Sequence, residues 1–218
     1  ANKGWNVAIS ARRENLLKEI SDSNENIYGF PLDVTDKLKC KEVFEEIKNK
    51  FQEIDICFFS TGTWNPKKEK DIDVEQIEDV FKVNFFGTLN SIKAVEEHFK
   101  NKKNGIITIV SSIAGYRGLP NSTGYGPSKS ALNNLAESLY FDFKRSNVRV
   151  CLVSPGFIKT PMTDKLSEDQ QNQILKNIPT SRFGLPSDVA SACIYLSSDE
   201  ASFVTGSTIH VNGGMGMF

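Results

Sequence analysis

The sequence of 218 residues has few of the side chains that metal sites and disulfide frameworks need. It contains only two histidines and four cysteines, and no two cysteines form a Cys-x-x-Cys pair. Two histidines are too few for the usual zinc site, so we expect no metal. Isolated cysteines are typical of reduced thiols, so we expect a cytoplasmic protein.

Excess charge and long apolar runs are lacking as well. The net charge is −1 at pH 7, which gives no electrostatic basis for binding nucleic acid. No apolar run approaches the roughly 18 residues of a membrane span, so we expect no membrane partner. The absence of a Gly-x-Ser-x-Gly elbow argues against a Ser-His-Asp hydrolase. No repeat or linker interrupts the sequence, which predicts a single domain over 1–218.

The sequence does contain a regular alternation of short β-rich runs and helical patterns. This alternation predicts an α/β fold with a doubly wound, Rossmann-like parallel sheet covered by helices on both faces. Strands are expected at Trp5–Ser10, Ile27–Pro31, Asp55–Ser60, Gly105–Ser111, Asn147–Val153 and Ser207–Val211. Helices are expected at Glu14–Ser21, Lys37–Phe51, Val74–Lys100, Pro127–Arg145 and Ser187–Leu196.

The stretch from Ser111 to Lys129 carries the side chains best suited to catalysis. Tyr125 and Lys129 are four residues apart, so on a helix they share one face, one turn apart. Pro127 suits a first helical turn, so the helix should begin near Tyr125. A cation beside the phenol is expected to lower the pKa of Tyr125 from about 10, which favours proton transfer near neutral pH. A Gly/Pro-rich loop can fold Ser112 back toward Tyr125.

A Tyr-x-x-x-Lys pair alone is usually structural, but this one follows an apolar strand that ends in Ser-Ser-x-Ala-Gly. The pattern resembles the short-chain dehydrogenase/reductase family over nearly the whole chain. The resemblance implies an oxidoreductase that interconverts a ketone or aldehyde and an alcohol by hydride transfer. It implies that Ser112 binds the substrate oxygen, that Tyr125 donates the proton, and that Lys129 lowers the Tyr125 pKa and holds the cofactor ribose.

The segment Asn84–Gly87 matches the Asn-x-x-Gly of the same family. By this resemblance Asn84 is a fourth catalytic residue, which relays protons from the lysine to solvent. A helix kink at Asn84–Gly87 is the alternative interpretation, because asparagine is unfavourable inside a helix.

The resemblance also implies a dinucleotide cofactor. Ala11 stands where an acid would bind the ribose of NAD, and Arg12 follows it, which favours the 2′-phosphate of NADP(H); a solvated arginine is the alternative. Asp33 and Val34 match the adenine contacts, although Asp33 is also placed to cap the helix from Lys37. The implied cofactor-binding residues are Arg12, Asp33, Val34, Gly62, Tyr125, Lys129, Pro155, Gly156 and Thr160.

Two features of the family pattern are missing from the sequence. A strand and a Gly-rich turn are expected before Ala1, with that strand at the centre of the sheet, between the strands at Trp5–Ser10 and Asp55–Ser60. We therefore expect a truncated sequence; a naturally shorter fold is the alternative, but it would leave a hole in the sheet. The family's Asn-Asn-Ala-Gly is also reduced to its glycine, Gly62.

The substrate stays open. Residues 161–180 are polar and weakly helical, and by resemblance they form a substrate lid. The C-terminal third resembles 3-oxoacyl-acyl-carrier-protein reductases, which dock acyl carrier protein on basic side chains. Lys103 fits one such position, whereas Asp164, with Lys165 beside it, stands at the other. Residues 114–120 look more like general carbonyl reductases, and a non-catalytic dinucleotide-binding relative is a further alternative.

The helices at Val74–Lys100 and Pro127–Arg145 carry more apolar side chains than one sheet face can cover. In the family these helices pair across a two-fold axis, so we expect a homodimer or homotetramer. The residues concerned are Phe81, Phe85, Phe86, Leu135, Leu139, Tyr140 and Phe143.

Overall fold

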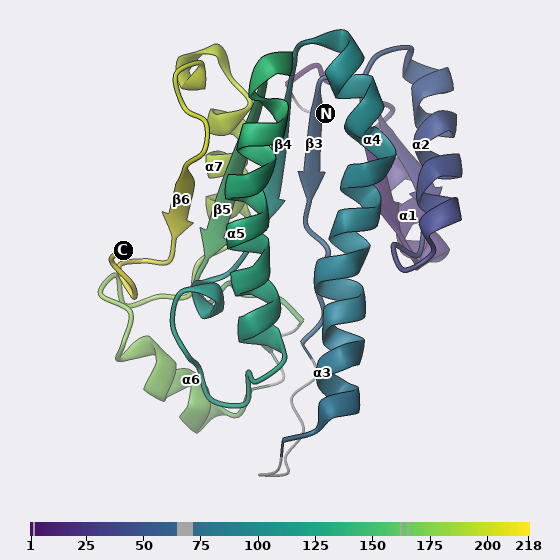
Figure 1. The fold of residues 1–218 in the computed structure, drawn as a ribbon. Coiled ribbons are helices and arrows are strands. Elements are labelled where there is room, and N and C mark those ends of the chain that lie inside the picture. Colours follow the sequence, from purple (N-terminus) through teal and green to yellow (C-terminus); the bar gives the residue numbers. More distant parts are fainter. Residues whose placement is uncertain (2, 65–71, 162, 165) are drawn as a thin grey trace.

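The computed structural model describes residues 1, 3–64, 72–161, 163–164 and 166–218 (Figure 1). Within them, strands and helices alternate, and every strand pair is parallel. The strands are β1 (Val7–Ala11), β2 (Ile27–Pro31), β3 (Ile56–Phe59), β4 (Gly105–Val110), β5 (Val148–Pro155) and β6 (Thr208–Val211). The helices are α1 (Glu14–Asp22), α2 (Lys37–Phe51), α3 (Val74–Phe81), α4 (Thr88–Lys102), α5 (Tyr125–Phe143), α6 (Glu168–Leu175) and α7 (Pro186–Leu196).

The predicted α/β architecture is confirmed. β3, β4, β5 and β6 form one sheet in that order, with Ile106 opposite Arg149 and Val153 opposite Ile209. β4 is apolar along its length, and its Ile107 and Ile109 side chains are fully buried. Such burial on both faces is typical of parallel strands between helical layers. Each expected strand is found within two residues of its predicted ends.

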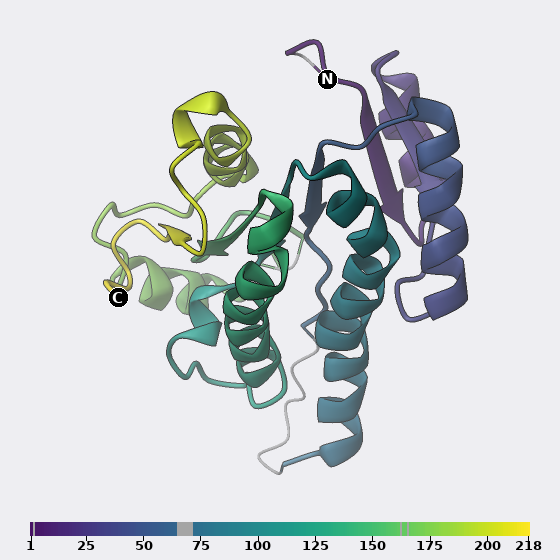
Figure 2. The same cartoon turned by 45° about the horizontal axis from the view of Figure 1, so that its top comes forward.

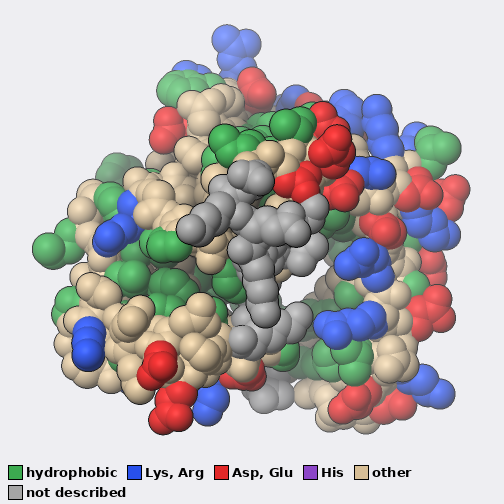
Figure 3. Space-filling model, turned by 90° about the horizontal axis from the view of Figure 1, so that it is seen from below, with side chains coloured by type: hydrophobic (Ala, Val, Ile, Leu, Met, Phe, Trp, Pro, Cys, Tyr) green, Lys and Arg blue, Asp and Glu red, His purple; other side chains and the backbone are tan. Residues whose placement is uncertain are grey.

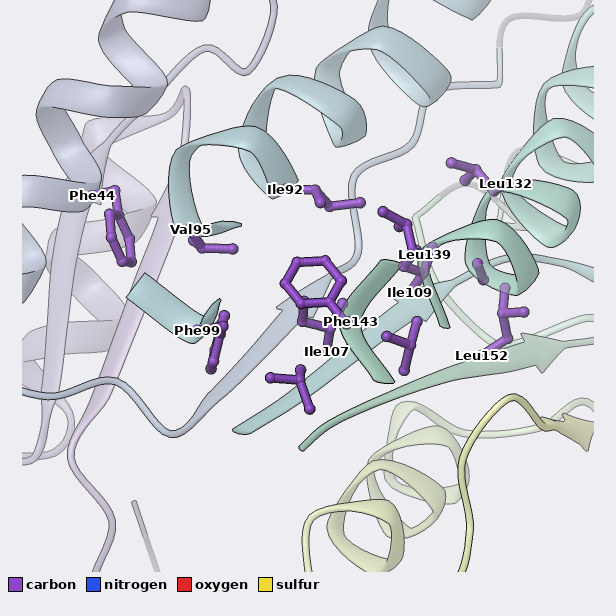
Figure 4. Packing of buried hydrophobic residues seen from close by; sticks show 13 residues of the cluster. Phe44, Ile92, Val95, Phe99, Ile107, Ile109, Leu132, Leu139, Phe143 and Leu152 are labelled. Atoms are coloured by element: carbon purple, nitrogen blue, oxygen red, sulfur yellow. The ribbon is translucent and has the colours of Figure 1, made fainter. Parts of the chain in front are cut away.

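Helices cover both faces of this sheet. On one face α4 and α5 pack against β4 and β5 through a cluster that includes Phe99, Ile107 and Phe143, drawn in Figure 4. On the other face Leu196 of α7 packs against Cys151 and Val153 of β5. Alternate residues of β5 therefore belong to different layers, which is the period-two pattern of a strand buried on both sides.

The sheet is split between β1 and β3. β1 and β2 form a separate two-stranded sheet, which lies with α1 and α2 to one side of the molecule (Figures 1 and 2). A cavity of about 1730 Å³ separates the two sheets and is lined by β1 residues such as Val7 and by β3 residues such as Phe59. The view from below shows the molecule hollowed here (Figure 3). The described residues place no strand in this gap, where the family pattern has one.

The long helix expected at Val74–Lys100 is interrupted. α3 and α4 are joined by a π-helical turn, Lys82–Gly87, which holds the buried side chain of Asn84. Single π-helical turns inside α-helices are frequent at functional sites. The kink and the inward-bonded asparagine, which are alternatives in the sequence, occur together, because the backbone is irregular where Asn84 bonds to Thr63 and Ser128.

Two smaller features complete the fold. Ser167 and Gln170 form a capping box that starts α6 within residues 161–180. Lys165, named in the carrier-protein comparison, lies outside the described residues. In the part of the chain that the structure describes, no helix is both long and apolar enough to cross a membrane.

Candidate active site

The predicted site residues lie at the carboxyl edge of the two sheets. Arg12 follows β1, Asp33 follows β2, Gly62 follows β3 and Ser112 follows β4, while Pro155 ends β5. In open parallel sheets this edge is where ligands bind. The fold therefore brings residues from the whole sequence to one side of the molecule.

Ser112 and Tyr125 meet across the loop that separates them. The backbone of Ser112 is extended, with φ −168°, and its hydroxyl accepts a hydrogen bond from the Ala114 amide at 3.2 Å. The Ser112 hydroxyl is also hydrogen-bonded to the phenol of Tyr125. α5 begins at Tyr125, as the position of Pro127 predicts, so the phenol stands at the mouth of the helix.

Lys129 lies one turn further into α5 and is buried, with 3% of its surface exposed. Its Nζ donates to the Thr61 carbonyl at 3.2 Å and to the Val110 carbonyl at 3.0 Å. An ammonium has three N–H donors, so these bonds use two of them. A side chain at Gly62 would lie 3.3 Å from the same Nζ, which explains why a glycine stands there.

The expected lowering of the Tyr125 pKa is not what the structure shows. Burial raises the pKa of Tyr125, and the hydrogen bond from Ser112 offsets this only in part. Burial also lowers the pKa of Lys129 to about 8, so near pH 8 the lysine carries only part of a charge. Its Nζ lies 5.8 Å from the centre of the Tyr125 ring. Desolvation of both groups therefore outweighs their attraction here.

Asn84 forms hydrogen bonds to two elements of the site, the segment after β3 and the first turn of α5. Its Oδ1 accepts from the Thr63 amide at 2.7 Å, and its Nδ2 donates to the Thr63 carbonyl at 3.1 Å and to Ser128 Oγ at 3.0 Å. Ser128 in turn donates to the Tyr125 carbonyl at 2.7 Å. The asparagine amide is thus fixed between the segment after β3 and the first turn of α5.

Three further residues that we did not assign from the sequence support the serine loop. Ser111 Oγ contacts Asn133 Oδ1 at 2.5 Å and the Lys129 carbonyl at 3.2 Å, and Asn133 donates to the Gly115 carbonyl at 3.2 Å. A side chain at Gly115 would lie 2.9 Å from Asn133 Nδ2. Helical spacing could have identified Asn133 from the sequence, because it lies one turn beyond Lys129 on the same helix.

The cofactor side contains Arg12, Asp33 and Val34, which line the cavity together with Gly62. Asp33 accepts hydrogen bonds from the Thr35 amide and hydroxyl, which lower its pKa, with a smaller contribution from Arg12. It does not cap α2, because Asp36 does so by accepting from the Lys39 amide. The capping alternative for Asp33 is therefore wrong.

Pro155 ends β5, and Gly156 and Thr160 follow it. The Gly156 amide donates to the Val211 carbonyl at 2.9 Å, and a side chain at Gly156 would meet Asn212 Cα at 2.9 Å. The Thr160 amide donates to Thr163 Oγ1 at 2.9 Å, so this turn is held from within. These three residues belong to the same edge as Ser112, since β5 neighbours β4.

The residues present fit a dinucleotide at this edge. Close backbone approaches at Gly62 and Gly156, the exposed cation of Arg12 and the N–H donor that Lys129 has left suit parts of a phosphorylated nucleotide. No group of three or more His, Cys, Asp or Glu side chains within the described ranges could hold a metal ion.

Comparisons with known proteins agree with this geometry. A family model described as enoyl-(acyl carrier protein) reductase matches residues 1–216. The 3-oxoacyl-[acyl-carrier-protein] reductase FabG of Thermotoga maritima is 35% identical over 202 residues, which cover 93% of this chain and 82% of the relative. The same enzyme of Escherichia coli is 34% identical over 218 residues, covering 100% of this chain and 89% of the relative.

Solved structures share the fold. The structure described as ElxO with NADP bound superposes with a TM-score of 0.90 at 27% identity and covers 98% of this chain and 90% of its own. The structure of gox2181 has a TM-score of 0.94 at 24% identity, covering 99% and 87%. At that identity the likeness supports the fold alone.

Proposed function

The chain belongs to the short-chain dehydrogenase/reductase family of nicotinamide-dependent oxidoreductases that act on carbonyl and alcohol groups, and we propose that it is an NADPH-dependent reductase of 3-oxoacyl thioesters. The observation that carries the carbonyl reduction is the convergence of Ser112, Tyr125 and Lys129, with the Tyr125 carbonyl bonded through Ser128 to Asn84. The thioester is proposed from the 3-oxoacyl-[acyl-carrier-protein] reductases to which the chain is similar. The bound nicotinamide supplies the hydride.

In the proposed reduction each residue has its own task. The Ser112 hydroxyl and the Tyr125 phenol, which lie close together, both bind the substrate oxygen. The raised pKa of Tyr125 keeps the phenol protonated at neutral pH, so it is ready to give its proton to the developing alkoxide. Lys129 holds the ribose and returns a proton to Tyr125. The Asn84 side chain fixes the segment Gly62–Thr63.

The phosphate preference is proposed from Arg12. Its guanidinium is exposed at the end of β1, beside Asp33, and no acid stands at Ala11 to bind a free ribose hydroxyl. A similar protein has been solved with NADP. Arginine pairs with phosphate through two parallel hydrogen bonds, which lysine does not.

The relatives are 3-oxoacyl-[acyl-carrier-protein] reductases, which favours a substrate carried by acyl carrier protein. The position of Lys103 argues against a docking surface for that protein next to the catalytic residues. Lys103 precedes β4 and Ser112 follows it, so the length of the strand, about 20 Å, separates them. Lys103 and the catalytic side chains of the same chain therefore lie at opposite ends of β4. General ketone reduction remains the second candidate.

We also propose that the protein is cytoplasmic and forms a homodimer or homotetramer. The four cysteines are free thiols, which supports the cytoplasm. A homodimer or homotetramer is supported by exposed aromatic side chains on the π-helical turn Lys82–Gly87 and on α5.

The test is steady-state reduction by the full chain with NADPH and NADH, using acetoacetyl-CoA, a longer 3-oxoacyl thioester and a simple ketone. We expect kcat/KM to be higher for NADPH, and Arg12→Ala to remove that preference, with Arg13→Ala as the matched control. An unchanged cofactor ratio in Arg12→Ala would contradict the NADPH assignment. Cofactor binding without turnover of any carbonyl would favour the non-catalytic relative, and turnover of the ketone alone would favour a general reductase.

A further inference from the structure

The residues that follow β6, Asn212–Phe218, lie between two parts of the site that are distant in sequence. Figures 1 and 2 show the C-terminal end beside the green segment that leads out of α6. On its other side it meets the loop that begins with Ser112. We refer to Asn212–Phe218 as the tail.

On the lid side the contact is made by backbone atoms. The Thr180 amide donates to the Gly213 carbonyl at 3.2 Å. A side chain at Gly213 would lie 2.4 Å from Thr180 Oγ1, and one at Gly214 would lie 3.0 Å from Pro179. Both glycines have positive φ, +63° and +85°, which other residues rarely adopt. The tail therefore fits closely against the last residues of the lid.

On the catalytic side the contact is made by side chains. The ring of Phe218 stacks on that of Tyr116, with centroids 5.0 Å apart and an interplanar angle of 27°. Tyr116 is held by a 2.9 Å hydrogen bond between its hydroxyl and Thr208 of β6, and Arg117 donates to the Met215 carbonyl at 3.2 Å. A side chain at Gly216 would lie 3.1 Å from Cδ1 of Ile113, the residue after Ser112.

The tail is also folded onto itself. Asn212, which is buried, donates from Nδ2 to the Gly216 carbonyl at 2.8 Å, and its Oδ1 accepts from the Gly214 amide at 2.9 Å. These two bonds fix the spacing between the glycine pair and Phe218. The lid end and the Ser112 loop therefore both contact one internally bonded segment.

We propose that the tail is a positioning segment that sets the distance between the lid and Ser112, with Phe218 as its anchor on Tyr116. The inference rests on the proposed reduction, in which the carbonyl substrate lies between the lid and the pair Ser112 and Tyr125. Because Arg12 and Asp33 belong to the other sheet, the tail acts on the substrate and not on the adenosine end of the cofactor.

The test compares Phe218→Ala with Met217→Ala, whose side chain is 93% exposed one position earlier. An aromatic pair contributes modestly, so we expect Phe218→Ala to lower kcat/KM for acetoacetyl-CoA about two- to tenfold. The Kd of NADPH, followed by its fluorescence, is expected to change less than twofold. Phe218→Tyr keeps the ring and should restore the wild-type value.

A second measurement does not depend on turnover. Hydrogen exchange of the amides at 113–117 and 178–180 should be faster in Phe218→Ala than in Met217→Ala. Equal exchange and equal kcat/KM in the two variants would overturn the inference. An equal loss in Phe218→Tyr, or a matching rise in the NADPH Kd, would overturn it too. If wild type reduces no carbonyl but the exchange difference is found, the proposed function fails and the positioning role stands.

Discussion

At the scale of single residues, the site is governed by desolvation. Tyr125 and Lys129 are both removed from water, so burial opposes the charged form of each: the pKa of the phenol rises and that of the ammonium falls to about 8. A neutral phenol can donate its proton. A lysine whose pKa is about 8 can exchange protons with its surroundings near neutral pH. The neutral phenol is the form that the proposed reduction needs, because Tyr125 must begin that step protonated.

Tyr125→Phe tests the proton donor. The change keeps the ring and its packing but removes the hydroxyl that meets Ser112, so kcat and kcat/KM should fall together by about 10² to 10⁴. The Kd of NADPH, titrated by fluorescence, should change little. Tyr195→Phe is the matched control, because this tyrosine is exposed on α7 and is not one of the site residues. Retention of more than about a tenth of wild-type kcat would mean that Tyr125 is not the acid.

Lys129 should leave a signature in the dependence of stability on pH. Its pKa is about 8 in the folded chain and 10.5 ordinarily, so between these values only the unfolded chain holds the proton. The free energy of unfolding should therefore rise with pH in this window, by about 1.4 kcal/mol per unit from this group, and not below pH 8. The measurement is urea unfolding of wild type and Lys129→Met from pH 7 to 9.5. A constant difference between them would contradict the lowered pKa.

At the scale of elements, the π-helical turn Lys82–Gly87 connects the cofactor side to the catalytic side. It turns Asn84 inward toward Thr63 and Ser128, and it brings Gly87 against Val34. Asn90, one turn later, donates to the Val34 carbonyl at 3.0 Å. The segment that follows β2 is thus held by the same helix that holds Asn84.

Gly87→Ala should weaken cofactor binding. A side chain at position 87 would lie 2.5 Å from Val34 Cγ2, so Val34 and the neighbouring Asp33 must shift. We expect the Kd of NADPH to rise about three- to tenfold, with a loss of stability of about 1–3 kcal/mol from overpacking. Gly118→Ala is the control, because no atom lies within 4 Å of the added carbon there. Equal NADPH affinities of the two variants would show that the close contact is not needed.

The elements differ in how far the sequence could predict them. The strands and α5 follow from local patterns, because β4 is continuously apolar and Pro127 marks a first turn. The π-helical turn could not be separated from a simple kink, since it depends on bonds from Asn84 to residues distant in sequence. The predicted direction of the Tyr125 pKa shift was wrong, because the sequence shows the neighbouring cation but not how deeply the phenol is buried. The assigned roles of the site residues, the lid and the single domain stay predictions.

At the scale of the whole molecule, the expected assembly surface needs a correction. Leu139 and Phe143, named as excess apolar residues of α5, are buried in the core, and Leu135 and Tyr140 pack against it. The exposed aromatic side chains of these helices are Phe86 and Phe141, which are 53% and 64% exposed. They leave a smaller exposed apolar surface on these helices than the sequence indicates.

Charge on that surface should disrupt the assembly. We expect light scattering at micromolar concentration to give a dimer or tetramer, and the double variant Phe86→Lys/Phe141→Lys to give a smaller species. Leu38→Lys on α2, whose side chain is 73% exposed, is the control and should leave the mass unchanged. A monomeric wild type would contradict the prediction.

In the described chain, no backbone hydrogen bonds between strands join β1 to β3. Backbone ladders stop at the cavity, so in the described chain residues 7–51 are attached to the rest mainly through α2 packed on α4, including Phe44 against the core. The two units, residues 7–51 and the rest of the described chain, are therefore joined by side-chain packing and not by a shared strand ladder. Arg12 and Asp33 belong to one unit, while Tyr125 and Lys129 belong to the other. A dinucleotide that contacts both units would hold them in place relative to each other. Its binding free energy would then stabilise their arrangement against separation.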